Sequence, residues 1–244
     1  MQQQQRRAQA TMADINDGLT GVDPVVIEAF EHAATLPGSA PARHSLSMST
    51  ETIRCTWPGM NGNALYEAYH DAEWGMPERD SHALWEKLVL DGFQAGLSWI
   101  TILKKREAFR AAFDDFDPVK VAAYGAADRM RLMTDAGIIR SNAKIDAAIS
   151  GAKNFLDIQA SGDTFSPWLW SFVGGRPIQT GHRHGDPATV SSAESIAMSK
   201  ALKAKGFKFC GPVIVYAFMQ ATGMVNDHTD RCFRHAPIKA MGAV

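Results

Sequence analysis

Apolar residues recur every three or four positions from Ile53 onward, which is the spacing of one face of an α-helix. Ser81 and Ser98 each precede such a series, and serine is a preferred residue at helix N-termini. A further helix is predicted to start at Asp117-Pro118. Another is predicted to start at a capping box of Ser191 and Glu194 and to end at Gly206. The last predicted helix lies between Pro212 and Gly223. Sustained apolar–polar alternation is absent, and 174–187 is predicted to be a loop. The predicted fold class is therefore all-α with short connections.

Residues 1–50 differ in composition from the rest of the chain. They contain a glutamine run at Gln2–Gln5 and a stretch rich in Pro, Ser and Ala at 36–45. We interpret 1–50 as a mobile extension with one short helix that starts at Asp23-Pro24 and ends near Ala34. Residues 51–244 are predicted to form the functional domain, which is long enough to bury a sizeable core.

Composition excludes several protein classes. The 25 Lys and Arg residues nearly balance the 26 Asp and Glu residues, and 45% of the residues are hydrophobic, so the chain is not disordered throughout. No apolar stretch reaches the roughly 18 to 20 residues of a membrane span, and no secretory signal opens the chain. Three cysteines cannot supply a disulfide framework, which favours a metal or core role and a cytoplasmic location.

Basic residues are concentrated between Arg129 and Lys153, where five basic residues stand against two acidic ones. Within this window, Leu132–Ile145 contains Gly137 between two helical patterns and resembles a helix-hairpin-helix, in which the amides that open the second helix face a DNA phosphate. Ile139 stands where the commonest form of this motif has a second glycine, so an ordinary helix pair remains an alternative. The other basic cluster, 200–208, is also explained by a solvated helix face.

The spacing of cysteine and histidine residues suggests a metal site. His228 and Cys232 are separated by three residues, so on a helical turn their side chains face the same way. Cys55 and His70 could complete a set of two cysteines and two histidines. Taken separately, Cys55 is equally explained as a small buried hydrophobe and His70 as a polar core residue, and Cys210 is predicted to be core.

Aromatic residues are dense near the start of the predicted domain. Most aromatic residues belong to the core, but five of these six have small or polar neighbours, where a planar purine could stack. The six are Trp57, Tyr66, Tyr69, Trp74, Trp85 and Trp99.

Several blocks in order resemble the type I 3-methyladenine-DNA glycosylases, a branch of the helix-hairpin-helix superfamily. The blocks are Tyr66–Gly75, Gln94–Ile100, Leu103–Glu107, Phe116–Lys120, Asp135–Arg140, Gly206–Phe209 and Val225–His228. The resemblance covers about Cys55 to Cys232 and leaves out the first 50 residues. It implies a glycosylase-like helical domain whose N- and C-terminal ends are joined by a structural Zn²⁺. The implied zinc ligands are Cys55, His70, His228 and Cys232.

The resemblance also implies base-excision repair of double-stranded DNA that contains alkylated bases, by flipping out 3-methyladenine and hydrolysing its N-glycosidic bond. Tyr69 would hydrogen-bond the base, Trp99 would stack on it, and Trp57, Trp74 and Tyr66 would form the pocket wall. Because no lysine is identified for a Schiff base, we expect a monofunctional enzyme. We also expect the protein to be a monomer. The residues implied in DNA binding are Gly137, Ile138, Ile139, Arg140 and Lys144, with Leu97 as the wedge that fills the vacated stack.

Asp91 departs from the family pattern, which typically has a glutamate that contacts the adenine edge. One methylene fewer shortens the reach by roughly 1.5 Å, enough to change activity or specificity in a positioned site. Asp91 is the predicted catalytic residue and the one charged group expected against the cationic base. Two alternatives stay open: a DNA-damage-binding protein with weak or altered glycosylase activity, which Asp91 would permit, and a zinc hydrolase. The hydrolase is disfavoured because four protein ligands close the coordination shell.

Overall fold

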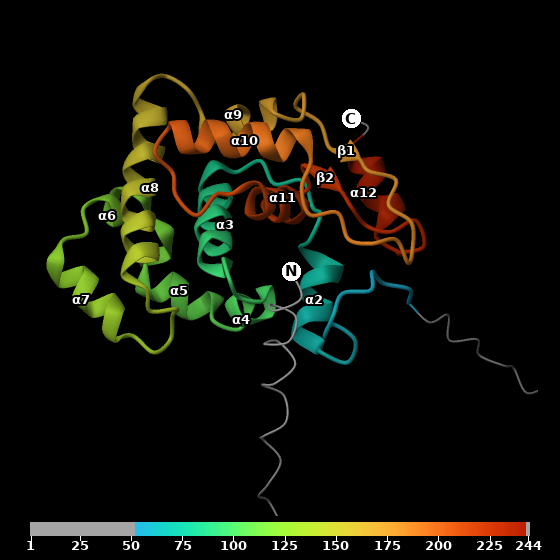
Figure 1. The fold of residues 1–244 in the computed structure, drawn as a ribbon, viewed down its shortest axis with the longest axis horizontal. Coiled ribbons are helices and arrows are strands. Elements are labelled where there is room, and N and C mark those ends of the chain that lie inside the picture. The colour runs from blue at the N-terminus through green and yellow to red at the C-terminus, as the bar shows by residue number, and fades with distance from the viewer. Residues whose placement is uncertain (1–51, 243–244) are drawn as a thin grey trace, which may run out of the picture. The chain divides into compact units, whose positions relative to one another are not determined.

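The computed structural model describes residues 52–242, and almost all of its regular structure is helical, as the sequence predicts (Figure 1). The predicted extension at 1–50, with its short helix, lies outside the described residues. The helices are α2 (Ala64–Ala72), α3 (Ser81–Gln94), α4 (Trp99–Leu103), α5 (Arg106–Ala112), the 3-10 helix η1 (Asp114–Phe116), α6 (Pro118–Ala122), α7 (Ala126–Thr134), α8 (Asn142–Ala160), α9 (Phe165–Ser171), α10 (Ala193–Ala204), α11 (Pro212–Ala221) and α12 (His235–Met241).

A short parallel strand pair is the exception to the all-α prediction. Strand β1 (Ile178–Gln179) pairs with β2 (Val225–Asn226), with Ile178 opposite Val225 and Gln179 opposite Asn226. β1 lies in the stretch that the sequence predicts to be a loop. Two residues are too few to show the alternation that identifies a strand, so this pairing is decided by tertiary contacts.

The predicted helix starts at Ser98, Asp117-Pro118 and Pro212 are confirmed, and two other starts are displaced by one residue. α3 is capped by Asp80, whose carboxylate accepts a hydrogen bond from the Ala83 amide at 2.8 Å, rather than by Ser81. The capping box of α10 uses Ser192 and Ser195 instead of Ser191 and Glu194. Aspartate and serine both cap helices well, so sequence spacing cannot choose between neighbours. The helix from Pro212 is also not the last, because α12 follows it.

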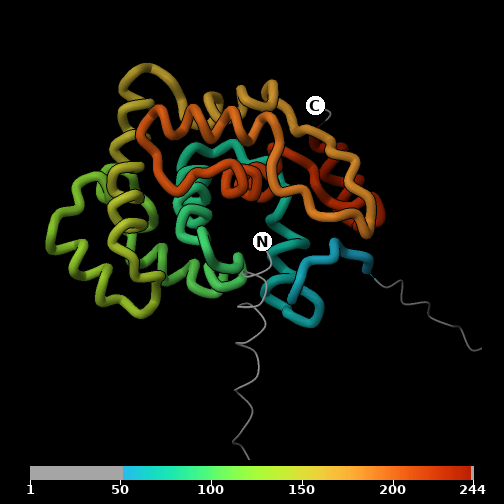
Figure 2. The backbone as a smooth tube through the Cα atoms, viewed as in Figure 1, coloured from blue at the N-terminus to red at the C-terminus, as the bar shows by residue number. Residues whose placement is uncertain are grey.

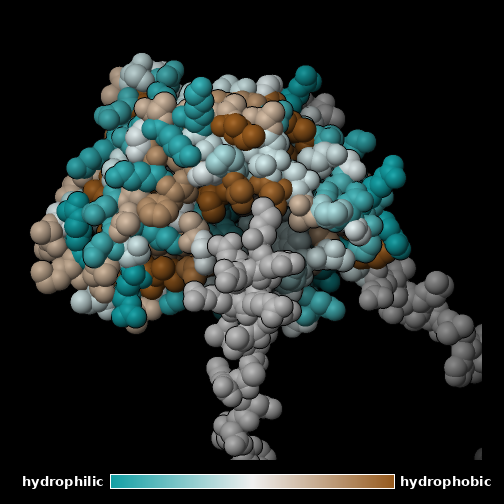
Figure 3. Space-filling view, in the orientation of Figure 1, coloured by the Kyte–Doolittle hydropathy of each residue, from teal (hydrophilic) through white to brown (hydrophobic). Residues whose placement is uncertain are grey.

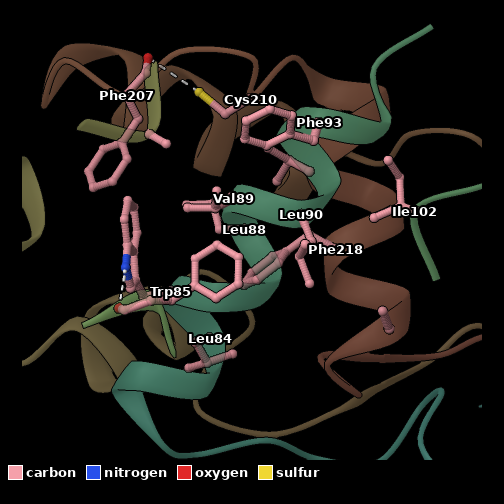
Figure 4. Packing of buried hydrophobic residues seen from close by; sticks show 14 of the residues in the cluster. Leu84, Trp85, Leu88, Val89, Leu90, Phe93, Ile102, Phe207, Cys210 and Phe218 are labelled. Carbon is pink, nitrogen blue, oxygen red and sulfur yellow. Dashed lines mark hydrogen bonds between the residues drawn. The ribbon is translucent and has the colours of Figure 1, made fainter. Parts of the chain in front are cut away.

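The core of the domain forms around α3, which packs against α11, while α10 packs against α11 and α6 against α8. The predicted apolar series on α3 is buried, and Trp85 donates a hydrogen bond from its indole nitrogen to the Phe116 carbonyl at 3.1 Å. Figure 4 shows this series beside the ring of Phe218 from α11. Cys210 is buried in the same core, as predicted.

The two ends of the described domain meet. The amide of Phe233 donates a hydrogen bond to the Ile53 carbonyl at 2.9 Å, and Figure 2 shows the first described segment beside the C-terminal one. This contact brings the segment that contains Cys55 close to the turn that carries Cys232.

One face of the domain has apolar residues near its centre and hydrophilic residues along its upper edge (Figure 3). Exposed large apolar side chains include Leu97 and Val213. Within residues 52–242, no helix has both the length and the apolar character required to cross a bilayer.

Candidate active site and metal centre

The four predicted ligands come together although the sequence separates them widely. Cys55, His70, His228 and Cys232 are all buried, and their ligand atoms lie within 4.8 Å of one another. Sγ of Cys232 lies 3.5 Å from Nε2 of His70 and 3.5 Å from Nδ1 of His228, and Sγ of Cys55 lies 3.6 Å from the same Nδ1. This cluster can hold a metal ion.

The outward nitrogen of each histidine has its own partner. Nδ1 of His70 lies 2.8 Å from Oδ1 of Asp71, and Asp71 in turn accepts hydrogen bonds from the Arg54 guanidinium. Nε2 of His228 lies 3.1 Å from the Trp74 carbonyl oxygen. Such partners fix the ring orientation of metal-binding histidines and direct the other ring nitrogen into the cluster.

The backbone that carries His228 and Cys232 differs from the predicted one, because the two residues lie on a turn and not on an α-helix. The amide of Cys232 donates to the Thr229 carbonyl at 2.8 Å, and this bond bends the chain so that both side chains point to the same place. Gly75 is required beside it: its φ is +82°, and a Cβ atom there would lie 2.8 Å from Nε2 of His228.

The thiols of this cluster influence each other. The hydrogen bond to Cys55 lowers the pKa of Cys232, and hydrogen bonds to His228 and His70 act in the same direction. The same contact with Cys232, together with burial, raises the pKa of Cys55. The lowered pKa of Cys232 favours its thiolate, the form in which cysteine binds metals.

A cavity of about 510 Å³ lies beside the cluster and is lined by aromatic side chains. The ring centroids of Trp57 and Trp74 are 4.6 Å apart, those of Trp57 and Tyr66 are 5.2 Å apart, and those of Tyr69 and Trp99 are 5.4 Å apart. The five predicted pocket aromatics therefore surround one space, whereas Trp85 belongs to the core. The cavity is concave, apolar and aromatic, as expected of a site for a planar ligand.

Asp91 lines this cavity from α3, with only 1% of its side chain exposed. Its carboxylate forms an ion pair with Lys87, one helical turn earlier, and Nζ of Lys87 lies 3.8 Å from the ring centroid of Trp99. Burial raises the pKa of Asp91 and lowers that of Lys87, and in both cases the charge of the partner opposes the shift.

This ion pair corrects one expectation from the sequence. Asp91 is not the one charged group at the cavity, because Lys87, which was not expected there, also lines it. The sequence contains a signal for this ion pair. Lys87 stands four positions before Asp91, and residues four positions apart on a helix share a face.

Two buried polar atoms at the cavity have no hydrogen-bond partner among the described residues: Oδ2 of Asp91 and Nε1 of Trp99. One accepts and the other donates hydrogen bonds. Unpaired buried polar atoms are costly, so these two atoms are available to hydrogen-bond a molecule that enters the cavity.

The predicted hairpin consists of α7 and α8, which pack together and are joined by residues 135–141. Gly137 does not have a positive φ. It is required for a steric reason, because a Cβ atom would lie 2.9 Å from Oδ1 of Asp135 and 3.0 Å from Cβ of Ala108. Lys105 ties the turn to the domain by donating to the carbonyls of Ala136 and Gly137 at 2.8 and 3.2 Å.

The basic residues of the hairpin are not equally available to contact DNA. Lys144 donates to the carbonyls of Phe93 and Ala95 at 2.8 and 2.7 Å, which holds α8 against the end of α3. Arg140 is exposed, Ile139 is partly buried, and Ile138 is in the core. The predicted DNA contact of Lys144 therefore competes with a structural role, while Arg140 is accessible.

Residues 57–235 match the family model of methyladenine glycosylases. The chain belongs to the methyladenine glycosylase family. It is 51% identical over 179 residues to DNA-3-methyladenine glycosylase 1 of Escherichia coli (strain K12), which covers 73% of this chain and 95% of that protein. A crystal structure of 3-methyladenine DNA glycosylase I superposes with a TM-score of 0.73 at 50% identity, covering 75% of this chain and all of the other.

A further solved relative is 3-methyladenine DNA glycosylase I from Staphylococcus aureus, whose structure concerns 3-methyladenine recognition. It is 40% identical with a TM-score of 0.69, and the match covers 72% of this chain and 97% of that chain. The described residues thus carry the fold of this family over nearly the whole length of its members.

This methyladenine glycosylase family member also has pocket residues that the sequence analysis did not identify. His182, Asp186 and Thr189 come from the segment between β1 and α10, and Asp227 follows β2. The buried carboxylate of Asp227 accepts hydrogen bonds from Oγ1 of Thr180 at 2.7 Å and from the side-chain amide of Gln220 at 2.6 Å. The one available signal was that Asp227 precedes His228 in a block that resembles the family.

Proposed function

We propose that this protein is a DNA-3-methyladenine glycosylase that acts in base-excision repair. It hydrolyses the N-glycosidic bond of 3-methyladenine in double-stranded alkylated DNA. The observation that carries the proposal is the aromatic cavity with a buried carboxylate, in a chain 51% identical to an enzyme of that name. A cavity of about 510 Å³ has room for a flipped purine, and the flat rings around it suit a planar base.

In the proposed mechanism, the damaged nucleotide leaves the helix and its base enters the cavity. Trp99 stacks on the base, the hydroxyl of Tyr69 hydrogen-bonds it, and Trp57, Trp74 and Tyr66 exclude water. Oδ2 of Asp91 accepts a hydrogen bond from the exocyclic amine. Because methylation at N3 makes the base cationic, the base departs as a neutral molecule and little protonation is required. Water then attacks C1′ of the sugar.

DNA binding is proposed for the hairpin and for the loop between α3 and α4. The turn at Gly137, Ile138 and Ile139 faces a phosphate with the amides that open α8, and the exposed Arg140 supplies charge. Lys144 supports this turn from behind. Leu97, 42% exposed between α3 and α4, is placed to fill the stack that the flipped base vacates.

The metal proposed for the cysteine–histidine cluster is Zn²⁺. A tetrahedral zinc ion separates nitrogen and sulfur ligands by roughly 3.3 to 3.8 Å, given bonds of about 2.0 to 2.3 Å. The distances of 3.5 and 3.6 Å between the sulfur and nitrogen atoms of the cluster agree with that geometry. Four protein ligands leave no open position for water, so the ion has a structural role, joining the segments that carry Cys55 and Cys232.

The decisive test is to incubate the purified protein with methylated double-stranded DNA and to identify the released bases by chromatography. We expect release of 3-methyladenine, little 7-methylguanine and no uracil. Damage-specific DNA binding without any released base would instead support the alternative of a damage-binding protein. A parallel reaction with borohydride tests the monofunctional assignment, because a covalent protein–DNA product that is lost in Lys87→Met would show that Lys87 forms a Schiff base with C1′.

A further inference from the structure

The ammonium of Lys87 lies where the proposed mechanism requires the positive charge of the alkylated base. It is paired with Asp91, which would contact the base, and stands 3.8 Å from the ring centroid of Trp99, on which the base would stack. Both contacts favour any cation at this place, whether it belongs to the substrate or to the protein. The pocket therefore already contains the charge that a cationic base would bring.

The surroundings hold Lys87 in this position. On its other side lies a second cavity of about 330 Å³, whose wall includes Glu73 and Glu86. Glu73 is bonded to Arg106 at 3.0 Å and Glu86 to Arg110 at 2.8 Å, so both carboxylates already have cationic partners. Asp91 is the buried carboxylate that remains for Lys87, whose side chain is 16% exposed.

An ammonium in a base pocket changes which bases are favoured. A cationic base meets a like charge there, which costs binding energy at short range in a buried site. A neutral base with a lone pair toward Lys87 gains a charge-assisted hydrogen bond, since only one of the three N–H groups is used by Asp91.

We propose that Lys87 is a specificity-determining residue that enables the same site to excise neutral damaged purines. This inference rests on the proposed glycosylase function and extends its substrate class. A neutral base departs with the electron pair of the broken C1′–N bond, so its leaving nitrogen becomes negative and needs a positive partner. Lys87 donates a proton to the departing base, water adds its hydroxyl to C1′, and the remaining proton of that water returns to the Lys87 amine.

The test compares two substrates in otherwise identical duplexes: 3-methyladenine, which is cationic, and hypoxanthine, a neutral purine with a carbonyl acceptor. Single-turnover excision is measured for the wild-type chain and for Lys87→Met, which keeps an unbranched apolar stem without the charge. Lys200→Met, at an exposed position on α10, is the matched control. Lys87→Gln is a second variant that keeps a neutral donor, and thermal unfolding verifies that each variant is folded.

We expect the wild-type chain to release both bases. Lys87→Met should raise the rate ratio of 3-methyladenine to hypoxanthine by about 10-fold or more, the range of a hydrogen bond to a charged group. Lys87→Gln should retain hypoxanthine binding but lose most of its excision, and Lys200→Met should leave the ratio unchanged.

Two results would overturn the inference and leave the proposed function intact. One is release of 3-methyladenine but no hypoxanthine by the wild-type chain. The other is an unchanged rate ratio of 3-methyladenine to hypoxanthine in folded Lys87→Met. Release of hypoxanthine alone would support the role of Lys87 while refuting the proposed function. Release of neither base would refute both.

Discussion

Removing one member of the Lys87–Asp91 pair should destabilise the folded domain, and removing both should cost less than the sum of the two. Because these side chains are 16% and 1% exposed, Asp91→Asn leaves a buried ammonium without its carboxylate. Such a loss typically costs about 3 to 5 kcal/mol, and we expect the lower value because burial already lowers the pKa of Lys87. At about 2 to 4 °C per kcal/mol for a domain of this size, the Tm should fall by roughly 6 to 12 °C.

The pH dependence has a defined sign. In Asp91→Asn the pKa of Lys87 falls further below its unfolded value. The charge of Arg106 acts in the same direction, and the charge of Glu73 opposes it. Between the folded and unfolded pKa values the unfolded chain binds more protons, so stability increases with pH. The deficit of Asp91→Asn relative to the wild-type chain should therefore shrink from pH 7 to pH 9.

Thermal and urea unfolding of the wild-type chain, Asp91→Asn, Lys87→Met and the double variant measure this coupling at both pH values. The double variant should be more stable than the sum of the single losses predicts, because it leaves no buried charge unpaired. Strictly additive losses, or a deficit of Asp91→Asn that grows with pH, would show that Lys87 and Asp91 are not a coupled buried pair.

Three other substitutions and one treatment test the site. Asp91→Glu should reduce excision of 3-methyladenine, because the position is 1% exposed and an added methylene overpacks it; higher activity would show that the pocket has room for the longer side chain. Trp99→Ala should weaken binding of the free base by about 1 to 3 kcal/mol in calorimetry, the scale of base–aromatic stacking, and no loss would make Trp99 a packing residue only. Gly137→Val should weaken DNA binding equally across sequences at fixed salt, because its Cβ would press on Ala108 and displace the turn; an unchanged Kd removes the turn from the interface. Chelation should lower the Tm before it affects excision, since the cluster closes the fold away from the reacting atoms; loss of activity with unchanged circular dichroism would indicate a catalytic metal.

The sequence by itself determined the features that local chemistry encodes. Helical periodicity and capping residues placed most helices, because they depend on residues within one turn of each other. The spacing of His228 and Cys232 suggested a metal site, and the family resemblance implied Cys55 and His70 as its other ligands before any distance was known. The grouping of aromatic residues near Trp99 likewise indicated a pocket for a planar ligand.

The tertiary structure alone decided how side chains with several available partners are used. Lys144 and Lys105 look like free cations in the sequence, but their ammonium groups are bonded to carbonyls of other elements. β1 and β2 are too short to be encoded locally, and they form because the chain brings Ile178 beside Val225. The side chain of Lys87 could point in several directions in an isolated helix. Packing against Trp99 and burial with Asp91 place its charge at the aromatic cavity. A long flexible side chain is directed by its three-dimensional surroundings, which sequence spacing does not specify.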